Sequence, residues 1–323
     1  MSKILSKKVL GYVVLAVITA GLIAVLLQVI SLQEFLTALT RLTLWQIPLL
    51  ILGFLGISVI AIFMKQFVLV ALDNRVPYKP LTLVHFASIA AHYSTPVKLG
   101  LPVTVYLLKQ MEDVPYAKSS IMIVLEIFTT TMITGAIALL GAALYFRERL
   151  GLILLALAGV AVIGVGLYLA LNYHKKKSDE EKTGKIRTYF NNLMRGFREL
   201  DLSAIAGYAG LTMVKQIASA AYLIGLLWCF SAHISLVEAL VAGSTAFFLG
   251  TISMVPLGLG VREASMLFYL NLFGIPMETA VAAVAVQRVI NTGFAYLLGI
   301  IAANLVGARF IQKNKPSPVG TKS

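Results

Sequence analysis

Charged residues are scarce in this sequence, and their scarcity excludes a soluble globular domain. Asp, Glu, Lys and Arg make up 13% of the 323 residues, whereas soluble domains carry about 25%. Cys229 is the single cysteine, so a disulfide framework and a thiolate metal site are both excluded. The sequence contains no HExxH, Gly-x-Ser-x-Gly or P-loop pattern, and a hydrolase or nucleotidase therefore has no motif support.

Hydrophobic residues are abundant, at 59% of the chain. A membrane-spanning helix needs about 20 mostly apolar residues. Six segments meet this requirement: 9–30, 45–71, 117–144, 151–171, 203–230 and 277–306. The sequence therefore predicts an all-α integral membrane protein with six long transmembrane helices, the first of them a retained helix rather than a cleaved signal peptide.

Two further apolar regions, 81–111 and 236–273, are interrupted by clusters of proline and glycine. The predicted turns contain Pro96 and Gly100 in the first region, and Pro256, Gly258 and Gly260 in the second. Half-segments too short to cross the bilayer favour two broken, re-entrant helical hairpins. The stretch 236–255 is long enough to cross, so the second hairpin is alternatively two full spans.

The net charge of +13 predicts the orientation in the membrane. A basic soluble chain would suggest nucleic acid, whereas a basic membrane protein holds its positive loops at the cytoplasmic surface. With both termini inside, cytoplasmic segments contain 19 of the 27 Lys and Arg residues, and outside loops contain Arg41, Arg147 and Arg149. We therefore expect a multi-pass protein of the cell membrane with cytoplasmic termini, and we interpret 174–201 as a solvated cytoplasmic loop.

The two halves of the chain share an ordered set of motifs, which predicts an internal repeat. Pro96-x-x-Leu99-Gly100 returns as Pro256-x-x-Leu259-Gly260, Lys65-Gln66 as Lys215-Gln216, and Glu126 with Thr130 as Gln287 with Asn291. Three crossings between corresponding helices would invert the halves, as in secondary transporters. The single transmembrane domain 1–323 then divides into 1–44, repeat A at 45–144, a connection at 145–202, repeat B at 203–308 and a tail at 309–323.

Seven charged residues lie at membrane depth, five of them cations. They are Lys65, Lys98, Lys215, Arg262 and Arg288, with Glu126 and Glu263. Isolated charges there are costly, so such residues are paired, hydrated or functional. We expect Arg262 to lie beside Glu263, and Glu126 to pair with Lys65 or Lys215 or to exchange a proton. The excess of cations indicates an anionic ligand.

The hairpins add backbone groups to this predicted anion site. A half-helix beginning after each turn would direct free N–H groups into the membrane, and glycines permit close approach. The candidate binding residues are Lys65, Lys98, Lys215, Arg262, Arg288, Gly100, Gly260 and Asn291. His85 and His92 lack a third ligand partner, so we expect no metal and no cofactor.

Two stretches resemble the lysylphosphatidylglycerol synthase transmembrane, or flippase-like, family. They are the sequence from Val255 to Ala264, VPLGLGVREA, followed by Gln287-Arg288, and the first-half residues Asp73 to Pro77, Tyr93 to Pro96 and Gly100. Leu101 stands where the family has glutamate. The resemblance implies a multispan protein that moves phosphate-bearing lipids between leaflets. A fused soluble aminoacyl-transferase domain, found in some relatives, is not seen here, so no synthesis of aminoacyl lipid is expected.

The function expected from these features is flippase-like transport, without enzymatic activity. The cargo would be a phospholipid, anionic or aminoacylated, or a polyprenyl-phosphate lipid, with its head group between the hairpins at Lys215 and Arg288. One alternative is a non-transporting partner that presents lipid to a lipid-modifying or glycosyltransferase enzyme. Others are an intramembrane enzyme that uses Glu126 or Glu263 with a histidine, and a channel.

Overall fold

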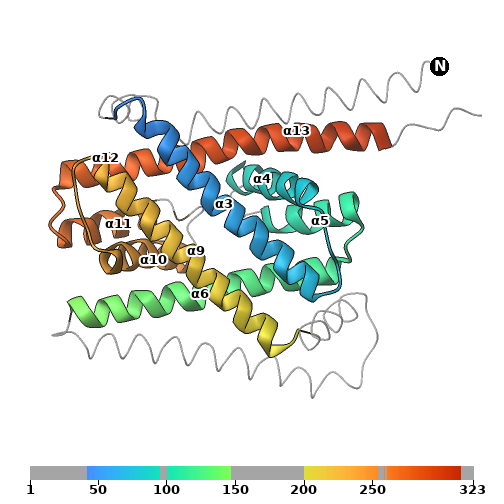
Figure 1. The fold of residues 1–323 in the computed structure, drawn as a ribbon, viewed down its shortest axis with the longest axis horizontal. Coiled ribbons are helices and arrows are strands. Elements are labelled where there is room, and N and C mark those ends of the chain that lie inside the picture. The colour runs from blue at the N-terminus through green and yellow to red at the C-terminus, as the bar shows by residue number, and fades with distance from the viewer. Residues whose placement is uncertain (1–41, 95–99, 147–199, 254–257, 259, 314–323) are drawn as a thin grey trace, which may run out of the picture.

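The computed structural model describes residues 42–94, 100–146, 200–253, 258 and 260–313, and all regular structure within them is helical (Figure 1). The predicted spans at 9–30 and 151–171 lie outside the described residues, as do Pro96, Lys98 and Pro256.

Four helices are long and apolar enough to cross a membrane, and they confirm four of the six predicted spans. They are α3 (Gln46–Ala71), α6 (Tyr116–Tyr145), α9 (Leu202–Trp228) and the continuous span Met277–Arg309. The last span comprises α12 (Met277–Arg288), the π-helical η3 (Val289–Phe294) and most of α13 (Ala295–Lys313). The protein is therefore an all-helical, multi-pass membrane protein.

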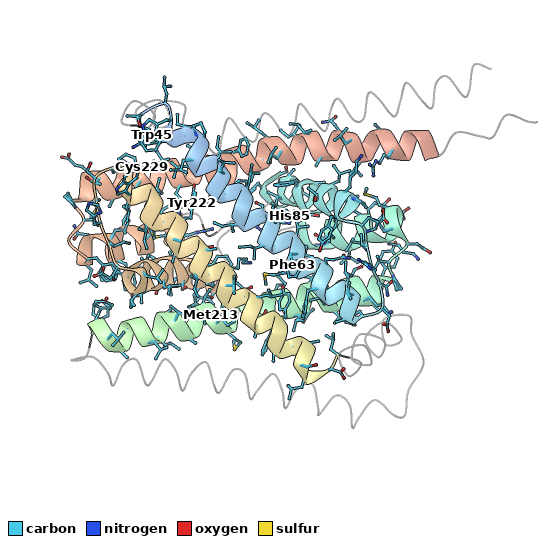
Figure 2. The ribbon with its side chains drawn as sticks, viewed as in Figure 1. Trp45, Phe63, His85, Met213, Tyr222 and Cys229 are labelled. Atoms are coloured by element: carbon cyan, nitrogen blue, oxygen red, sulfur yellow. The ribbon has the colours of Figure 1, made fainter. Side chains whose placement is uncertain are left out.

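The outer surfaces of the long helices carry large apolar side chains that the described residues leave largely exposed. Phe63 on α3 and Met213 on α9 are 44% and 40% exposed (Figure 2), and Phe128 on α6 is 59% exposed. Contiguous exposed apolar surface of this kind is costly in water. These side chains accordingly face the lipid.

Four shorter helices lie between the long ones. They are α4 (Tyr78–Ser94), α5 (Gly100–Glu112), α10 (Leu236–Ile252) and α11 (Val261–Leu272). The longest have 17 residues and measure about 25 Å at 1.5 Å per residue, less than the bilayer core of about 30 Å. In each pair, the chain leaves the first helix at the proline and glycine cluster, as the sequence predicts.

A glycine permits the tight packing of α5 against α4. A side chain at Gly100 would place its Cβ 2.5 Å from the backbone oxygen of Ser88 and 2.6 Å from the Cβ of His92.

Helix α11 begins differently, because Gly260 has a φ of +79° and its N–H donates to the Glu263 carboxylate at 2.8 Å. That hydrogen bond satisfies one of the donors that a helix start leaves free.

Helices α3 and α9 pack side by side and antiparallel through the middle of the molecule (Figure 1). Trp45, at the start of α3, meets Trp228, at the end of α9, with ring centroids 6.0 Å apart. Tyr222 lies over Gly53, and farther along the pair Phe67 lies over Gly207. Helices α3 and α9, which both carry a Lys-Gln pair, therefore run in opposite directions.

The shorter helices pack across the two halves rather than only within their own. Helix α4 packs against α13 of the second half, and α10 packs against α6 of the first half. Figure 1 shows α4 with α5 on one side of the α3 and α9 pair, and α10 with α11 on the other. Because each half packs against helices of the other half, the two halves together enclose a central space.

Candidate functional site

A cavity of about 370 Å³ lies between the halves, and each of the described helices contributes to its wall. The volume is near the lower end of the range for small-molecule sites, which runs from about 300 to 1,000 Å³. His85 on α4 and Tyr222 on α9 are two of the lining residues, and Figure 2 shows both near the centre of the molecule. The cavity is therefore formed jointly by the two halves.

Cations predominate among the described charged residues that line the cavity. Lys65, Lys215 and Arg262 come from α3, α9 and α11, and the single carboxylate is Glu126 on α6. With His85 and His92 neutral, the local net charge is +2. Because charge at membrane depth is costly without a counter-charge, this cavity is suited to an anion.

Lys65 and Glu126 form an ion pair within the wall. The Lys65 side chain is 10% exposed and that of Glu126 is 25% exposed, so protein atoms cover most of the surface of both side chains. The carboxylate therefore neutralises one of the three cations and is already engaged.

Lys215 and Arg262 have no such partner, since no carboxylate of the described residues lies within ion-pair distance of either. Lys215 is half-buried and lies within electrostatic range of Glu126 and Lys65. The Arg262 guanidinium carbon is 5.7 Å from the centroid of the Phe247 ring, a cation–π contact that stabilises the charge without neutralising it. The two cations remain available to an anionic group.

Arg288 and Glu263 lie outside the lining of the cavity, although the sequence nominated both. An Arg288 Nη1 atom is 3.7 Å from a Glu263 Oε1 atom. Glu263 therefore contacts Arg288 rather than the adjacent Arg262, while its other oxygen accepts the hydrogen bond from Gly260. Glu263 therefore links the start of α11, through Gly260, to Arg288 of the long C-terminal span.

Uncharged polar groups complete the wall. Ser88, Thr130 and Tyr222 are each less than a tenth exposed, and their hydroxyl groups have no hydrogen-bond partner among the described residues. The same is true of the side-chain oxygen of Asn291. Buried polar groups are normally hydrogen-bonded, so these four atoms are exceptions close to the cavity, although each has almost no accessible surface.

The C-terminal span changes its helical geometry beside the cavity. Asn291 lies in the π-helical segment η3, and Gln287, one turn earlier, also lines the cavity. Short π-helical insertions within α-helices occur frequently at functional sites. Glu126 and Thr130, which the predicted repeat matches with Gln287 and Asn291, lie in the regular α-helix α6.

The structure brings together only part of the predicted site. The candidate residues that line the cavity are Lys65, Lys215, Arg262, Gly100, Asn291 and Glu126. Gly258, Gly260, Glu263 and Arg288 do not line it, and Lys98 lies outside the described residues. The described residues contain no group of three or more His, Cys, Asp or Glu placed to hold a metal ion.

Several lining residues were not among the binding residues predicted from the sequence, which considered His85 and His92 only as metal ligands. His85, Ser88 and His92 all face the cavity from α4. Their spacing of three and four residues places them on one helix face, which is the signal that would have identified them. Tyr222 carries no comparable signal, because aromatic residues on an apolar helix are common in membrane proteins.

Comparison with known proteins supplies the family. No curated protein sequence matches the chain significantly. The family model described as the lysylphosphatidylglycerol synthase TM region matches residues 9–299, which include every residue that lines the cavity. The chain therefore belongs to the lysylphosphatidylglycerol synthase TM region family, whose members are membrane proteins related to lipid handling.

Proposed function

We propose that this protein transports a phosphate-bearing lipid between the leaflets of the cell membrane. The observation that carries the proposal is the central cavity, which combines an excess of cations with walls from both halves. In this mechanism the lipid head group passes through the cavity while the acyl or prenyl chains stay in the bilayer.

The phosphate would bind Lys215 and Arg262, the two cations of the cavity wall that have no carboxylate partner among the described residues. Hydrogen bonds between charged groups are about twice as strong as neutral ones, and a phosphate supplies the missing counter-charge. Lys65 contributes less to this binding because Glu126 already neutralises it. Binding therefore replaces water around the phosphate with protein donors, which lowers the barrier to crossing.

The membrane arrangement that we propose has six spans, two re-entrant hairpins in inverted repeats, and both termini in the cytoplasm. The antiparallel α3 and α9 support the inversion, and the short lengths of α4, α5 and α11 support re-entry. Because α4 packs against α13 and α10 packs against α6, motion of either hairpin is coupled to the opposite half. Alternating exposure would follow from opposed hairpin motion.

We propose transport rather than enzymatic chemistry because the carboxylates at membrane depth are engaged. Glu126 is paired with Lys65, and Glu263 contacts Gly260 and Arg288. A general acid or base must reach the substrate proton, and neither group is free to do so. With no nucleotide-binding motif in the sequence, transport would be downhill, potential-driven or ion-coupled.

Translocation of a labelled anionic phospholipid in proteoliposomes tests the proposal. Lys215→Ala and Arg262→Gln should each slow translocation by about tenfold or more, since a hydrogen bond to a charged group contributes about 1.5–3 kcal/mol. The matched control is Lys109→Ala, because Lys109 pairs with Asp113 at the end of α5 and does not line the cavity.

Three other outcomes would each contradict the proposal. Equal rates for wild type, Lys215→Ala and Lys109→Ala would remove the assigned role of the cavity. A change in lipid mass during the assay would indicate an enzyme. Lipid binding without translocation, together with co-purification of a lipid-modifying enzyme, would favour the non-transporting partner.

A further inference from the structure

We propose that His85 is a proton-binding site of the cavity, and that each anionic lipid crosses the membrane together with one proton bound there. This inference rests on the proposed function and adds to it the ion that drives transport. The phosphate binds at other residues, so the histidine is a second, separate site in the same cavity.

The His85 side chain is placed to exchange a proton with water in the cavity. It lines the wall from α4 and is half-buried, and Figure 2 shows it near the centre of the molecule. Its ring meets the Phe86 ring edge-on, with centroids 5.1 Å apart. No hydrogen bond within the described chain involves the imidazole, so a ring nitrogen remains able to take up a proton.

Charged groups from three other helices act on His85. They are Lys65 of α3, Glu126 of α6 and Lys215 of α9. Lys65 and Glu126 form an ion pair, and their charges oppose each other at His85, whereas Lys215 has no carboxylate within ion-pair distance among the described residues. A positive neighbour disfavours the charged form of a histidine. The empty cavity therefore keeps His85 neutral.

The helices packed directly against α4 add no further charge at His85. These helices are α13, α5 and α3. Besides Lys65, the titratable groups with described side chains on them and on α4 are Tyr296 and Arg309 of α13, Tyr106, Lys109 and Glu112 of α5, and Tyr78, Lys79, His92 and Tyr93 of α4. None of these is among the charges that act on His85. Lys65, Glu126 and Lys215 therefore determine whether the histidine is protonated.

An anion bound at Lys215 and Arg262 reverses this balance. A negative charge nearby favours the protonated form of a histidine, and an unperturbed histidine titrates at about pH 6.5. The imidazole then takes a proton from the water on the side where the lipid enters. When the lipid leaves on the other side, Lys215 is again uncompensated and the proton returns to water there. Binding of the anion and binding of the proton therefore favour each other.

Coupling to one proton makes the crossing electrically neutral. Lys65, Lys215, Arg262 and Glu126 give the empty cavity a net charge of +2. A phosphodiester with one negative charge lowers this net charge by one, and a proton on His85 restores it. Because the lipid and the proton together carry no net charge, the membrane potential neither drives nor opposes the movement. A difference in pH across the membrane drives it instead.

Transport of labelled phosphatidylglycerol in proteoliposomes tests the coupling, with the pH gradient and the membrane potential set independently. We expect a gradient of about one pH unit, acidic on the side that the lipid leaves, to raise the initial rate about threefold or more. A potassium diffusion potential of either sign should change the rate by less than about twofold, because no net charge moves. A rate that follows the potential and ignores the pH gradient would overturn the coupling while leaving transport intact.

Replacement of the histidine should change the driving force and not only the rate. His85→Gln keeps a polar side chain but binds no proton, so transport should lose its dependence on the pH gradient and become sensitive to the potential. A purely structural role of His85 would slow transport without this conversion. His233→Gln is the matched control, because His233 is exposed before α10 and does not line the cavity.

Two other results would overturn the assignment to His85. The first is retention of the pH dependence in His85→Gln together with its loss in His92→Gln, since His92 also lines the cavity. The second is retention in His85→Gln together with loss in Glu126→Gln, which would place the proton on the carboxylate.

Proton uptake on lipid binding separates this inference from the proposed function. It is measured with a pH indicator in weakly buffered detergent solution near pH 6.5. Wild type should take up about half a proton or more per phosphatidylglycerol bound, and His85→Gln about none. If uptake occurs without translocation, transport is wrong and the proton site stands. If wild type binds the lipid without proton uptake, the proton site is wrong even if transport is observed.

Discussion

Lys65 on α3 forms an ion pair with Glu126 on α6 inside the central cavity. The repeat predicted from the sequence matches Glu126 with Gln287, which also lines the cavity but carries a neutral amide. The two halves consequently contribute different charge to a shared cavity. This asymmetry leaves Lys215 without the counter-ion that Lys65 has.

Removal of the Glu126 charge should destabilise the protein. Glu126→Gln leaves the Lys65 ammonium group uncompensated, at a cost of about 3 kcal/mol in the free energy of unfolding, the lower end for broken buried pairs. The double variant Lys65→Met/Glu126→Gln should recover much of this loss, because no uncompensated charge remains. Thermal unfolding in detergent measures both, and equal stability of wild type and Glu126→Gln would contradict the buried pair.

A second carboxylate should reduce binding of anionic lipid. Gln287→Glu places a second carboxylate in the wall of the cavity that Lys215 and Arg262 also line. We expect translocation of phosphatidylglycerol to fall about tenfold, since the phosphate would compete with an internal carboxylate. Gln287→Met, similar in size but uncharged, is the control, and an equal fall in both variants would show that charge is not the cause.

The packing of α13 against α4 predicts a strong dependence on side-chain size. A Cβ at Gly299 would lie 2.7 Å from both the Ala90 Cβ and the Phe86 backbone oxygen. Gly299→Ala should therefore lower the free energy of unfolding by about 1–3 kcal/mol. Gly225→Ala on α9 meets no atom of the described residues within 4 Å and should raise it by about 0.5–1 kcal/mol. Thermal unfolding of the two variants compares them directly.

Glu263 stabilises the start of α11 in two ways that substitutions can separate. Glu263→Ala removes the hydrogen bond from Gly260 and the contact with Arg288, and should cost about 1–2 kcal/mol. Glu263→Gln retains an oxygen that accepts from Gly260 and should cost about 1 kcal/mol or less. Unfolding midpoints distinguish them, and identical losses would mean that the hydrogen bond to Gly260 contributes nothing.

The antiparallel α3 and α9 predict the sides of two loops. In a Cys229→Ser background, Lys79→Cys in the first turn of α4 should react with an impermeant thiol reagent only from the cytoplasmic side. His233→Cys before α10 should react only from the outside, because α9 ends at the opposite end of the helix pair. Both positions are exposed. Labelling from the same side would exclude inverted halves.

The hydropathy of the sequence alone determined the helical class, the positions of four described spans and the sites where the shorter helices end. These features depend on local residues, since an apolar run of sufficient length forms a helix in lipid whatever its neighbours are. The matches of Lys65 with Lys215 and of Glu126 with Gln287 also follow from the sequence. All four of these residues line one cavity, as the predicted repeat would lead one to expect.

Only the tertiary structure decided which charges pair and which remain free. Glu263 is adjacent to Arg262 in sequence, yet it contacts Arg288, because successive residues of a helix point in different directions. Arg262 instead lies over Phe247 of α10, and the free hydroxyls of Ser88 and Tyr222 come from different helices. Such contacts depend on the packing of helices distant in sequence, and that packing converts a general excess of positive charge into a cavity with two available cations.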